Sequence, residues 1–335
     1  MTRGVYITID VECSMGGAWG RPDVRPVPPS RAIMGEYGRR RMGLPMIVDI
    51  MERQGLAGTF FVEPFAAEQG HPDTMAPICE YLTERGQDVQ LHVHPNHRHY
   101  GRSREGKDFR FNDNIAELDL DEQCELLAEG ADRLERWTGR RPAAFRAGNM
   151  GASEETLGPL ARAGIRIDSS YSPSSLGGNC RFKETERYNG SKWYGDVLEV
   201  ALSGFRQPAM PGLRPYKPCN VVAISFAEMR DAVTAILESG ADAVLILHSF
   251  SLFKVRNDQY DGGRPDRIVI RRFERLCRWL GDGASDRPVR TFTELAADVA
   301  AGRYEAARAA PRLLYRPWRG LARKAVQAYN RFYWT

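Results

Sequence analysis

The sequence has no apolar run long enough to span a bilayer, so we do not expect a membrane-spanning protein. Strand-like sequence already begins at Val5, and we therefore expect no signal peptide in front of it. The six cysteines are scattered and include no C-x-x-C pair, and a chain of 335 residues can bury a core without disulfide bonds. These absences predict a cytoplasmic protein with reduced thiols.

Acidic residues are absent from the end of the chain. Between Arg308 and Thr335 there are seven basic residues and no acidic one, so the rest of the chain is slightly acidic although the net charge is +4. An acidic body without aromatic residues among basic ones argues against nucleic acid as a partner. The tail 303–335 has the pattern of a basic amphipathic helix, which fits either a peripheral contact with an anionic membrane or packing on the barrel or on a partner subunit. The apolar residues at helical spacing are Trp318, Leu321, Ala325, Tyr329 and Phe332.

Strand-like and helix-like segments alternate along residues 1–302. The runs Gly58–Val62 and Ala243–His248 have the β-branched, aromatic or strongly apolar composition of buried strands. Between them, Leu120–Trp137 carries apolar residues at helical spacing and is followed by Gly139. Such alternation is typical of a parallel α/β barrel or sheet. We therefore expect one α/β catalytic domain over residues 1–302, followed by the tail.

Two strand-like stretches end in pairs of side chains that commonly bind metals. Asp10 and Glu12 end the first stretch, and His92 and His94 end the second. Because side chains alternate along a strand, each pair lies on one face, opposite the apolar residues. Two carboxylates and two imidazoles are what a mononuclear metal hydrolase requires. We interpret the two pairs as one site.

Three further strands end in polar residues, namely Arg146, Asp168 and His248. Active sites of α/β barrels lie at the carboxyl ends of the strands, because the strand ends and the following loops converge there. Any one of these residues alone is more often a helix cap or a hydrogen-bonded core group. The coincidence of five such strand ends predicts an active site.

Six stretches, taken in order, resemble the motifs of the polysaccharide deacetylases, the NodB-homology family. The resemblance extends over residues 4–299 and implies a distorted (β/α) barrel of about seven parallel strands. It also implies a divalent metal, usually zinc, that serves to hydrolyse the N-acetyl group of a sugar. The six stretches are Thr8–Glu12, Gly58–Val62, His92–Pro95, Phe145–Asn149, Ile167–Ser170 and Leu247–Phe250.

The resemblance implies a role for each matching polar residue. Asp10 corresponds to the general base, and Arg146 to the arginine that pairs with this base and orients it. His248 corresponds to the general acid, and Asp168 to the acidic residue that holds that histidine in its tautomer. A backbone N–H near Asn149 is expected to help hold the oxyanion.

The metal ligands implied by the resemblance are Glu12, His92 and His94. The adjacent Asp-Asp of the family is here Asp10-Val11-Glu12, so Glu12, Asp10 or both are candidates for the metal. The two histidines are two residues apart rather than four, which leaves His97 as an alternative to His94. We favour His94 because it shares a strand face with His92.

Three long segments rich in Gly, Pro or polar residues are expected to be loops that build the substrate groove. They are Cys13–Arg41, Arg98–Asn114 and Ser172–Asn220. Among them, Trp19, Trp193 and Tyr194 are candidate surfaces for stacking on a sugar, and the alternative is that they form loop core.

The sequence thus predicts a zinc-dependent deacetylase of an N-acylated sugar, free or lipid-linked, in surface-polysaccharide or lipopolysaccharide biosynthesis. Amidohydrolase-like and PHP-like metal hydrolases of non-carbohydrate amides or phosphoesters also contain H-x-H, but there it tends to lie on the first strand. A non-catalytic glycan-binding module is the third interpretation, because a fold alone does not establish a function.

Overall fold

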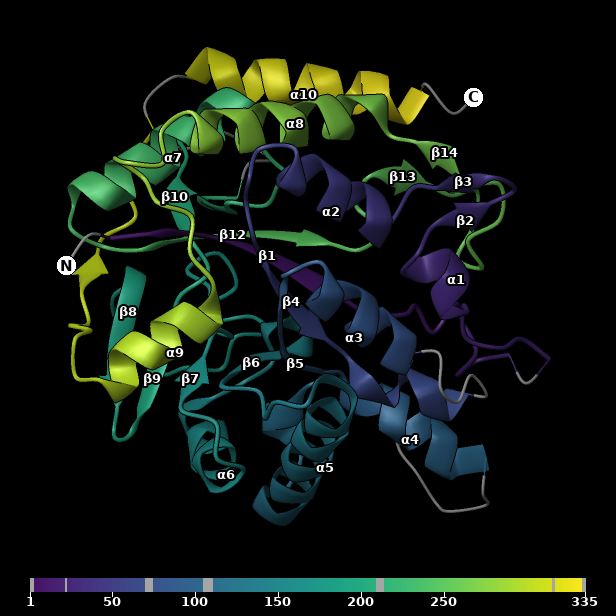
Figure 1. The fold of residues 1–335 in the computed structure, drawn as a ribbon. Coiled ribbons are helices and arrows are strands. Elements are labelled where there is room, and N and C mark those ends of the chain that lie inside the picture. The colour runs from purple at the N-terminus through teal and green to yellow at the C-terminus, as the bar shows by residue number, and fades with distance from the viewer. Residues whose placement is uncertain are drawn as a thin grey trace.

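A nine-stranded sheet forms the centre of the computed structural model, which describes residues 3–21, 23–69, 75–104, 111–208, 214–314 and 317–332 (Figure 1). Its strand order is β12-β1-β4-β5-β6-β7-β9-β8-β15, and the strands from β12 to β9 are parallel. The sheet curls into a half-barrel, which confirms the expected distorted barrel of about seven parallel strands. The parallel strands are β1 (Val5–Val11), β4 (Thr59–Val62), β5 (Asp88–Val93), β6 (Ala144–Ala147), β7 (Ile167–Asp168), β9 (Val197–Val200) and β12 (Ala243–His248).

The remaining strands are antiparallel. β8 (Asn189–Tyr194) and β15 (Arg308–Ala309) extend the main sheet beyond β9. Three small two-stranded sheets lie outside it. They are β2 (Glu36–Tyr37) with β3 (Arg40–Arg41), β10 (Gly204–Arg206) with β11 (Tyr216–Pro218), and β13 (Phe253–Lys254) with β14 (Arg264–Pro265).

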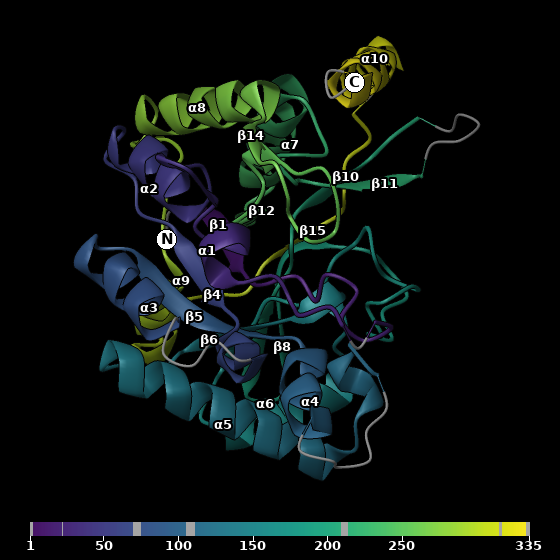
Figure 2. The same ribbon diagram turned by 90° about the vertical axis from the view of Figure 1, so that its right-hand side faces the viewer.

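Helices cover the outer face of the half-barrel. Figure 2 shows α2, α3, α5 and α8 stacked as an outer layer on one side of the strands. The longer helices are α2 (Leu44–Glu52), α3 (Met75–Glu84), α4 (Pro95–Arg104), α5 (Leu120–Thr138), α7 (Phe226–Glu238), α8 (Arg267–Gly281), α9 (Phe292–Ala300) and α10 (Pro317–Phe332). The short ones are α1 (Pro29–Ala32), α6 (Leu157–Arg162) and the 3₁₀ turns Pro64–Gln69, Ile115–Glu117, Gly148–Met150 and Glu154–Thr156.

The alternation along β1 separates two cores. Val5, Ile7 and Ile9 point into the large cluster beneath the helices, whereas Tyr6 belongs to a smaller cluster inside the half-barrel. Because side chains alternate, Asp10 lies on the same side of β1 as Tyr6. The polar residues of the strand ends therefore face the interior of the half-barrel.

Helix α9 fills the amino end of the half-barrel. Its first residue, Phe292, packs edge-on against Tyr6 and Phe61, with ring centroids 5.2 Å apart in both pairs. Thr291 caps the helix through a reciprocal capping box with Glu294. With one end filled by aromatic rings, the carboxyl ends of the strands are left for a polar site.

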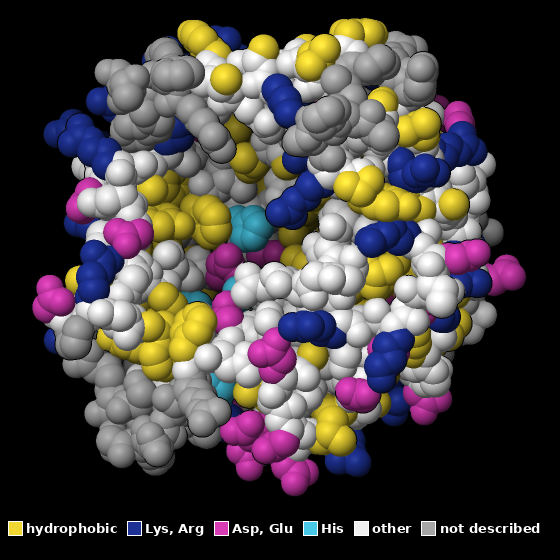
Figure 3. Space-filling model, turned by 180° about the vertical axis from the view of Figure 1, so that it is seen from behind, with side chains coloured by type: hydrophobic (Ala, Val, Ile, Leu, Met, Phe, Trp, Pro, Cys, Tyr) yellow, Lys and Arg dark blue, Asp and Glu magenta, His cyan; other side chains and the backbone are white. Residues whose placement is uncertain are grey.

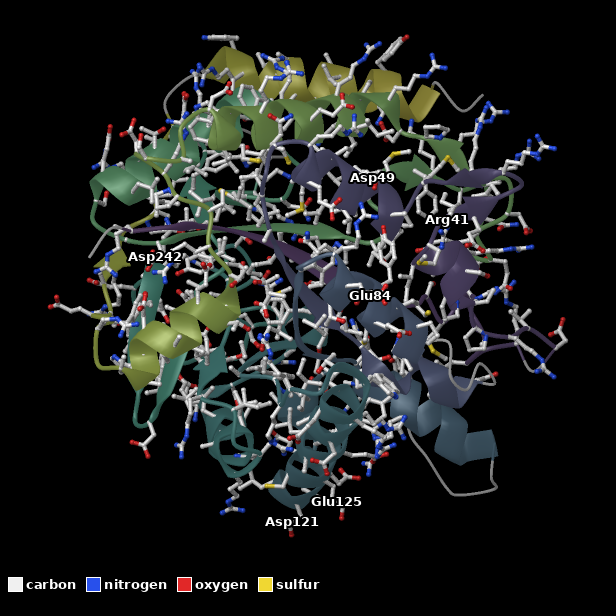
Figure 4. The ribbon with its side chains drawn as sticks, viewed as in Figure 1. Arg41, Asp49, Glu84, Asp121, Glu125 and Asp242 are labelled. Carbon is white, nitrogen blue, oxygen red and sulfur yellow. The ribbon has the colours of Figure 1, made fainter. Side chains whose placement is uncertain are left out.

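Asp242 joins the start of the barrel to the C-terminal segment. This residue, labelled in Figure 4, precedes β12 and accepts a 2.7 Å hydrogen bond from the backbone N–H of Gly4. It also accepts a 2.7 Å hydrogen bond from the hydroxyl of Tyr304. The segment after α9 is therefore anchored beside the first strand.

The three expected loops are partly ordered into helices and strands. The segment Arg98–Asn114 begins within α4, whose residues from Asn96 to Tyr100 are all buried. Because these buried residues are mostly polar, no hydrophobic spacing marks the helix. The segment Cys13–Arg41 contains α1 and the β2–β3 hairpin, and Ser172–Asn220 contains the four strands β8 to β11.

The expected basic tail helix is present as α10. It lies beside α7 and α8 at the edge of the molecule (Figure 1). In the described part of the chain, no helix is both long enough and apolar enough to cross a membrane.

Candidate metal centre and acid–base groups

Glu12, His92 and His94 converge at the carboxyl ends of β1 and β5. One ligand atom from each lies within 4.8 Å of the other two. Glu12 Oε2 is 3.0 Å from His92 Nε2 and 2.6 Å from His94 Nε2. Figure 3 shows histidine and acidic side chains together in a hollow near the middle of the face opposite that of Figure 1. One carboxylate and two imidazoles are donor groups that fit a divalent metal ion.

The ring of His92 is held in one tautomer by the backbone. Its Nδ1 lies 2.8 Å from the carbonyl oxygen of Arg146, to which an Nδ1–H donates. The other ring nitrogen, Nε2, lies 3.0 Å from Glu12 Oε2. A hydrogen bond of this kind is the usual outer partner of a metal-binding histidine.

His94 is positioned by two contacts that the sequence did not predict. Its Nδ1 lies 2.9 Å from Asp113 Oδ2, which also accepts a 2.7 Å hydrogen bond from the side-chain amide of Asn149. Its ring packs on Gly148, where an added Cβ would lie 2.5 Å from Nδ1. The ring therefore sits between a carboxylate and a backbone that has room only for glycine.

Glu12 and His94 change each other's ionisation. Burial alone would raise the pKa of Glu12, but the charge of His94 and hydrogen bonds from His92 and His94 hold that pKa well below its usual value. Burial alone would lower the pKa of His94, but Glu12 and Asp113 raise it well above its usual value. The carboxylates thus create a local potential that favours a positive charge at the ring of His94.

Asp10 and Arg146 form a buried ion pair beside this cluster. Arg146 Nη1 donates to Asp10 Oδ1 at 2.6 Å and to the hydroxyl of Thr8 at 2.9 Å. Its other nitrogens donate to the backbone carbonyl and the hydroxyl of Ser169, both at 3.1 Å, and the guanidinium stacks on Phe61. Since both partners are shielded from water, the orientation of the Asp10 carboxylate is fixed.

His248, the last residue of β12, completes the group. Its Nε2 is 4.0 Å from Asp10 Oδ2 and 3.8 Å from Glu12 Oε1. Its ring stacks on Phe250 at a centroid distance of 5.0 Å, and its side chain keeps 28% of its surface exposed. The β1–β12 pairing brings Asp10 opposite His248, so both groups face the same space.

Asp168 lies at the carboxyl end of β7, but its partners differ from the expected one. Its Oδ1 accepts a 2.6 Å hydrogen bond from the hydroxyl of Ser170, and its register partner on β9 is Glu199. In the described residues no hydrogen bond or ion pair joins Asp168 to His248. In the sheet order, four strands (β1, β4, β5 and β6) lie between β12 and β7.

Asp168 and Glu199 form a fully buried carboxyl pair that the sequence did not indicate. Asp168 Oδ2 and Glu199 Oε2 receive no hydrogen bond from other groups, so a proton held between the two carboxyls satisfies both. Burial, followed by the charge of Asp168, raises the pKa of Glu199 well above its usual value. Burial raises the pKa of Asp168 as well, so the two carboxyls share a proton between them.

The structure brings His94, and not His97, to Glu12 and His92. His97 lies in α4 with its ring centroid 5.8 Å from that of His94, and it is outside the three-residue cluster. Burial, with the charge of His94, lowers the pKa of His97 to about 3. His97 is therefore a neutral, buried neighbour of the cluster.

The aromatic candidates lie in different places. Trp19 is part of an aromatic group with Tyr100 and Phe111, at ring distances of 5.5 Å, and Phe111 is two residues from Asp113. Trp193 and Tyr194 belong to β8, which is antiparallel to β9, and Tyr194 pairs with the first residue of β9. This direction carries both residues away from the carboxyl ends at which the metal-site residues lie. Tyr194 also donates a hydrogen bond to Glu184.

Glu63 is a further buried carboxyl that the sequence analysis did not identify. It follows β4 directly, and its backbone N–H donates to the carbonyl of Val11 at 3.0 Å. Burial raises the pKa of Glu63 to about 8, against the opposing charge of His94. Its position after a strand end is the same signal that identified Asp10 and His248, so the sequence could have revealed it.

Comparisons with known proteins bear on the fold. No protein-family model matches the sequence, and no curated protein matches it. The structure is similar to that of a putative polysaccharide deacetylase from Mycobacterium smegmatis, with 19% identity, 94% of each chain covered and a TM-score of 0.52. A weaker similarity is to the peptidoglycan deacetylase PdaC from Bacillus subtilis, with 13% identity, 90% of this chain and 93% of that chain covered and a TM-score of 0.42. Another is to a CE4 family pseudoenzyme from Bacillus anthracis, with 11% identity, 88% of this chain and 66% of that chain covered and a TM-score of 0.46. The structural neighbours of this chain are thus polysaccharide deacetylases of the CE4/NodB family, and the chain has their fold.

Proposed function

We propose that this protein is a divalent-metal-dependent hydrolase that removes the N-acetyl, or another N-acyl, group from an amino sugar of a glycan. The observation that supports this most directly is the placement of Asp10, paired with Arg146, and of His248 beside the cluster of Glu12, His92 and His94. Hydrolysis of an amide requires such a combination of a metal site, a base and an acid.

The donor set fits a divalent ion such as zinc. Both imidazoles direct Nε2 at the same carboxylate oxygen, and each Nδ1 is occupied by an outer hydrogen bond. Three protein ligands leave a coordination position open for water or substrate. When bound, the ion would supply a Lewis acid that activates the water and polarises the amide carbonyl.

Two residues of the chain would move the protons. Arg146 binds Asp10 Oδ1, so Oδ2 is the oxygen that takes a proton from the attacking water. His248 in its protonated form gives a proton from Nε2 to the amine nitrogen as the C–N bond breaks. The products are a carboxylic acid and a free amino sugar. His248 Nε2 lies 4.0 Å from Asp10 Oδ2, so the base and the acid face the same space.

The aromatic group of Trp19 and Phe111 is the proposed surface for the sugar ring. Phe111 is 60% exposed and lies two residues from Asp113, which holds His94. Aromatic rings beside a hydrolytic site offer an apolar face for the C–H side of a sugar. These contacts fit a free and a lipid-linked amino sugar equally well. A role in surface-polysaccharide or lipopolysaccharide synthesis stays a prediction from the sequence.

The test is acetate release from N-acetylated glucosamine oligomers by zinc-loaded protein. Asp10→Asn keeps the size of the side chain and removes the base, so we expect activity to fall by about 10²–10⁴-fold while zinc binding is retained. Turnover of phosphoesters without amide hydrolysis would instead favour a PHP-like enzyme. Binding of the oligomers without any turnover would favour a glycan-binding module.

A further inference from the structure

Helix α10 presents its apolar face to solvent. The exposed fractions are 62% for Trp318, 54% for Leu321, 41% for Val326 and 62% for Tyr329. Ala322 and Ala325, between them on the same face, are also exposed. Figure 3 shows hydrophobic side chains along the upper edge of the molecule, where α10 lies in Figure 1. An amphipathic helix of a globular protein normally turns this face to the core, so the orientation of α10 is reversed.

The opposite, polar face of α10 holds the helix in this orientation. Arg323 is buried and makes an ion pair with Glu228 and a hydrogen bond to Gln207. Arg319 pairs with Asp231 on the same helix, α7. At the other end of α10, Asn330 donates a 2.8 Å hydrogen bond to Asp266. Turning the apolar face inward would leave the buried Glu228 without its partner, which is costly.

The charges around the exposed face are positive. The segment from Arg308 to Thr335 has no acidic residue, and Lys324 is exposed on α10. Beside Tyr329, the exposed Arg267 and Arg271 of α8 line a cavity of about 200 Å³. Within the described part of the chain, Lys324, Arg267 and Arg271 make no ion pair with a carboxylate. These charges are therefore available to an anionic partner.

We propose that the exposed face of α10 (Trp318, Leu321, Ala322, Ala325, Val326 and Tyr329) binds the surface of an anionic lipid bilayer. The apolar side chains would enter the interface between headgroups and acyl chains, where Trp and Tyr rings are favoured. Lys324, Arg267 and Arg271 would contact the anionic headgroups. A second copy of the chain is a poorer occupant, because apposing two such faces would bring two positively charged segments together.

The experiment is sedimentation of the full chain with vesicles, which needs no knowledge of the substrate. The test variant is Trp318→Gln combined with Leu321→Gln. The matched control is Leu120→Gln, because Leu120 is 50% exposed on α5 and outside this face. Circular dichroism and thermal unfolding establish that all three proteins are folded.

We expect the unmodified protein to bind mixed phosphatidylcholine–phosphatidylglycerol vesicles, and pure phosphatidylcholine vesicles more weakly. The double variant should partition about tenfold more weakly into the mixed vesicles, and Leu120→Gln should behave as the unmodified protein. Equal binding by the double variant and the control would overturn the proposal. The proposal would also be overturned if the unmodified protein bound no vesicles but formed a dimer, and if the double variant were a monomer.

Discussion

Replacing Gly148 by alanine should disable the metal site through a single methyl group. The added Cβ would lie 2.5 Å from Nδ1 and 2.6 Å from Cγ and Cε1 of His94, whereas ordinary contacts begin at 3.4 Å. The imidazole ring would have to move by about 0.9 Å, well beyond the roughly 0.2 Å within which metal–ligand distances are held. The ring cannot yield freely, since Glu12 and Asp113 hold both of its nitrogens. We therefore expect zinc affinity to fall about 10–100-fold.

Competition with a chromophoric chelator would measure this affinity. Gly158→Ala is the matched control, because a Cβ at Gly158 meets nothing within 4 Å and that residue lies in α6. The φ of Gly148 is not in the left-handed region, so the effect would be steric rather than a backbone effect. Wild-type zinc affinity in a folded Gly148→Ala protein would refute the assignment of His94 as a ligand and return His97 to consideration.

Two further predictions concern buried charges. Glu199→Gln should flatten the pH dependence of the unfolding free energy. The pKa of Glu199 is raised in the folded state above its ordinary value of 4.5. The contribution of Glu199 to wild-type stability is therefore fully present below pH 4.5 and is lost as the pH rises through the folded-state pKa. Urea unfolding between pH 5 and pH 9 would measure this, and parallel curves for both proteins would contradict it. Arg146→Met should cost about 3–5 kcal/mol of unfolding free energy, because Asp10 would remain buried without its partner. A loss below about 1 kcal/mol in the same assay would show that Asp10 does not depend on Arg146 for its burial.

The sequence predicted those parts of the site that follow from local periodicity. Asp10 with Glu12 and His92 with His94 each lie two residues apart, so a strand places each pair on one face whatever the rest of the fold does. The parallel α/β order then places the strand ends together. His248 was identified by the same reasoning, and its place opposite Asp10 follows from the β1–β12 pairing.

The sequence could not predict contacts between segments far apart in the chain. Asp113 lies in a polar stretch without a pattern, and only the folded chain brings it to His94. Glu199 is a partner of Asp168 because β9 lies next to β7 in the sheet. No local sequence pattern predicts that pairing. The antiparallel direction of β8, which moves Trp193 and Tyr194 away from the site, is likewise a property of the whole sheet.

The tail illustrates a different limit. Helical spacing predicted the amphipathic helix α10, but periodicity does not tell which face packs on the protein. The packing face of α10 is determined by Glu228 and Asp231 of α7, because they bind Arg323 and Arg319. The apolar face is left outward as a consequence of those ion pairs.

The central claim is that Glu12, His92 and His94 bind one divalent ion next to Asp10 and His248. An anomalous difference map from crystals of the zinc-loaded protein tests it most directly. We predict one strong peak in contact with Glu12 and with Nε2 of both His92 and His94. A zinc peak bound elsewhere, with these three side chains in contact only with one another, would contradict the account.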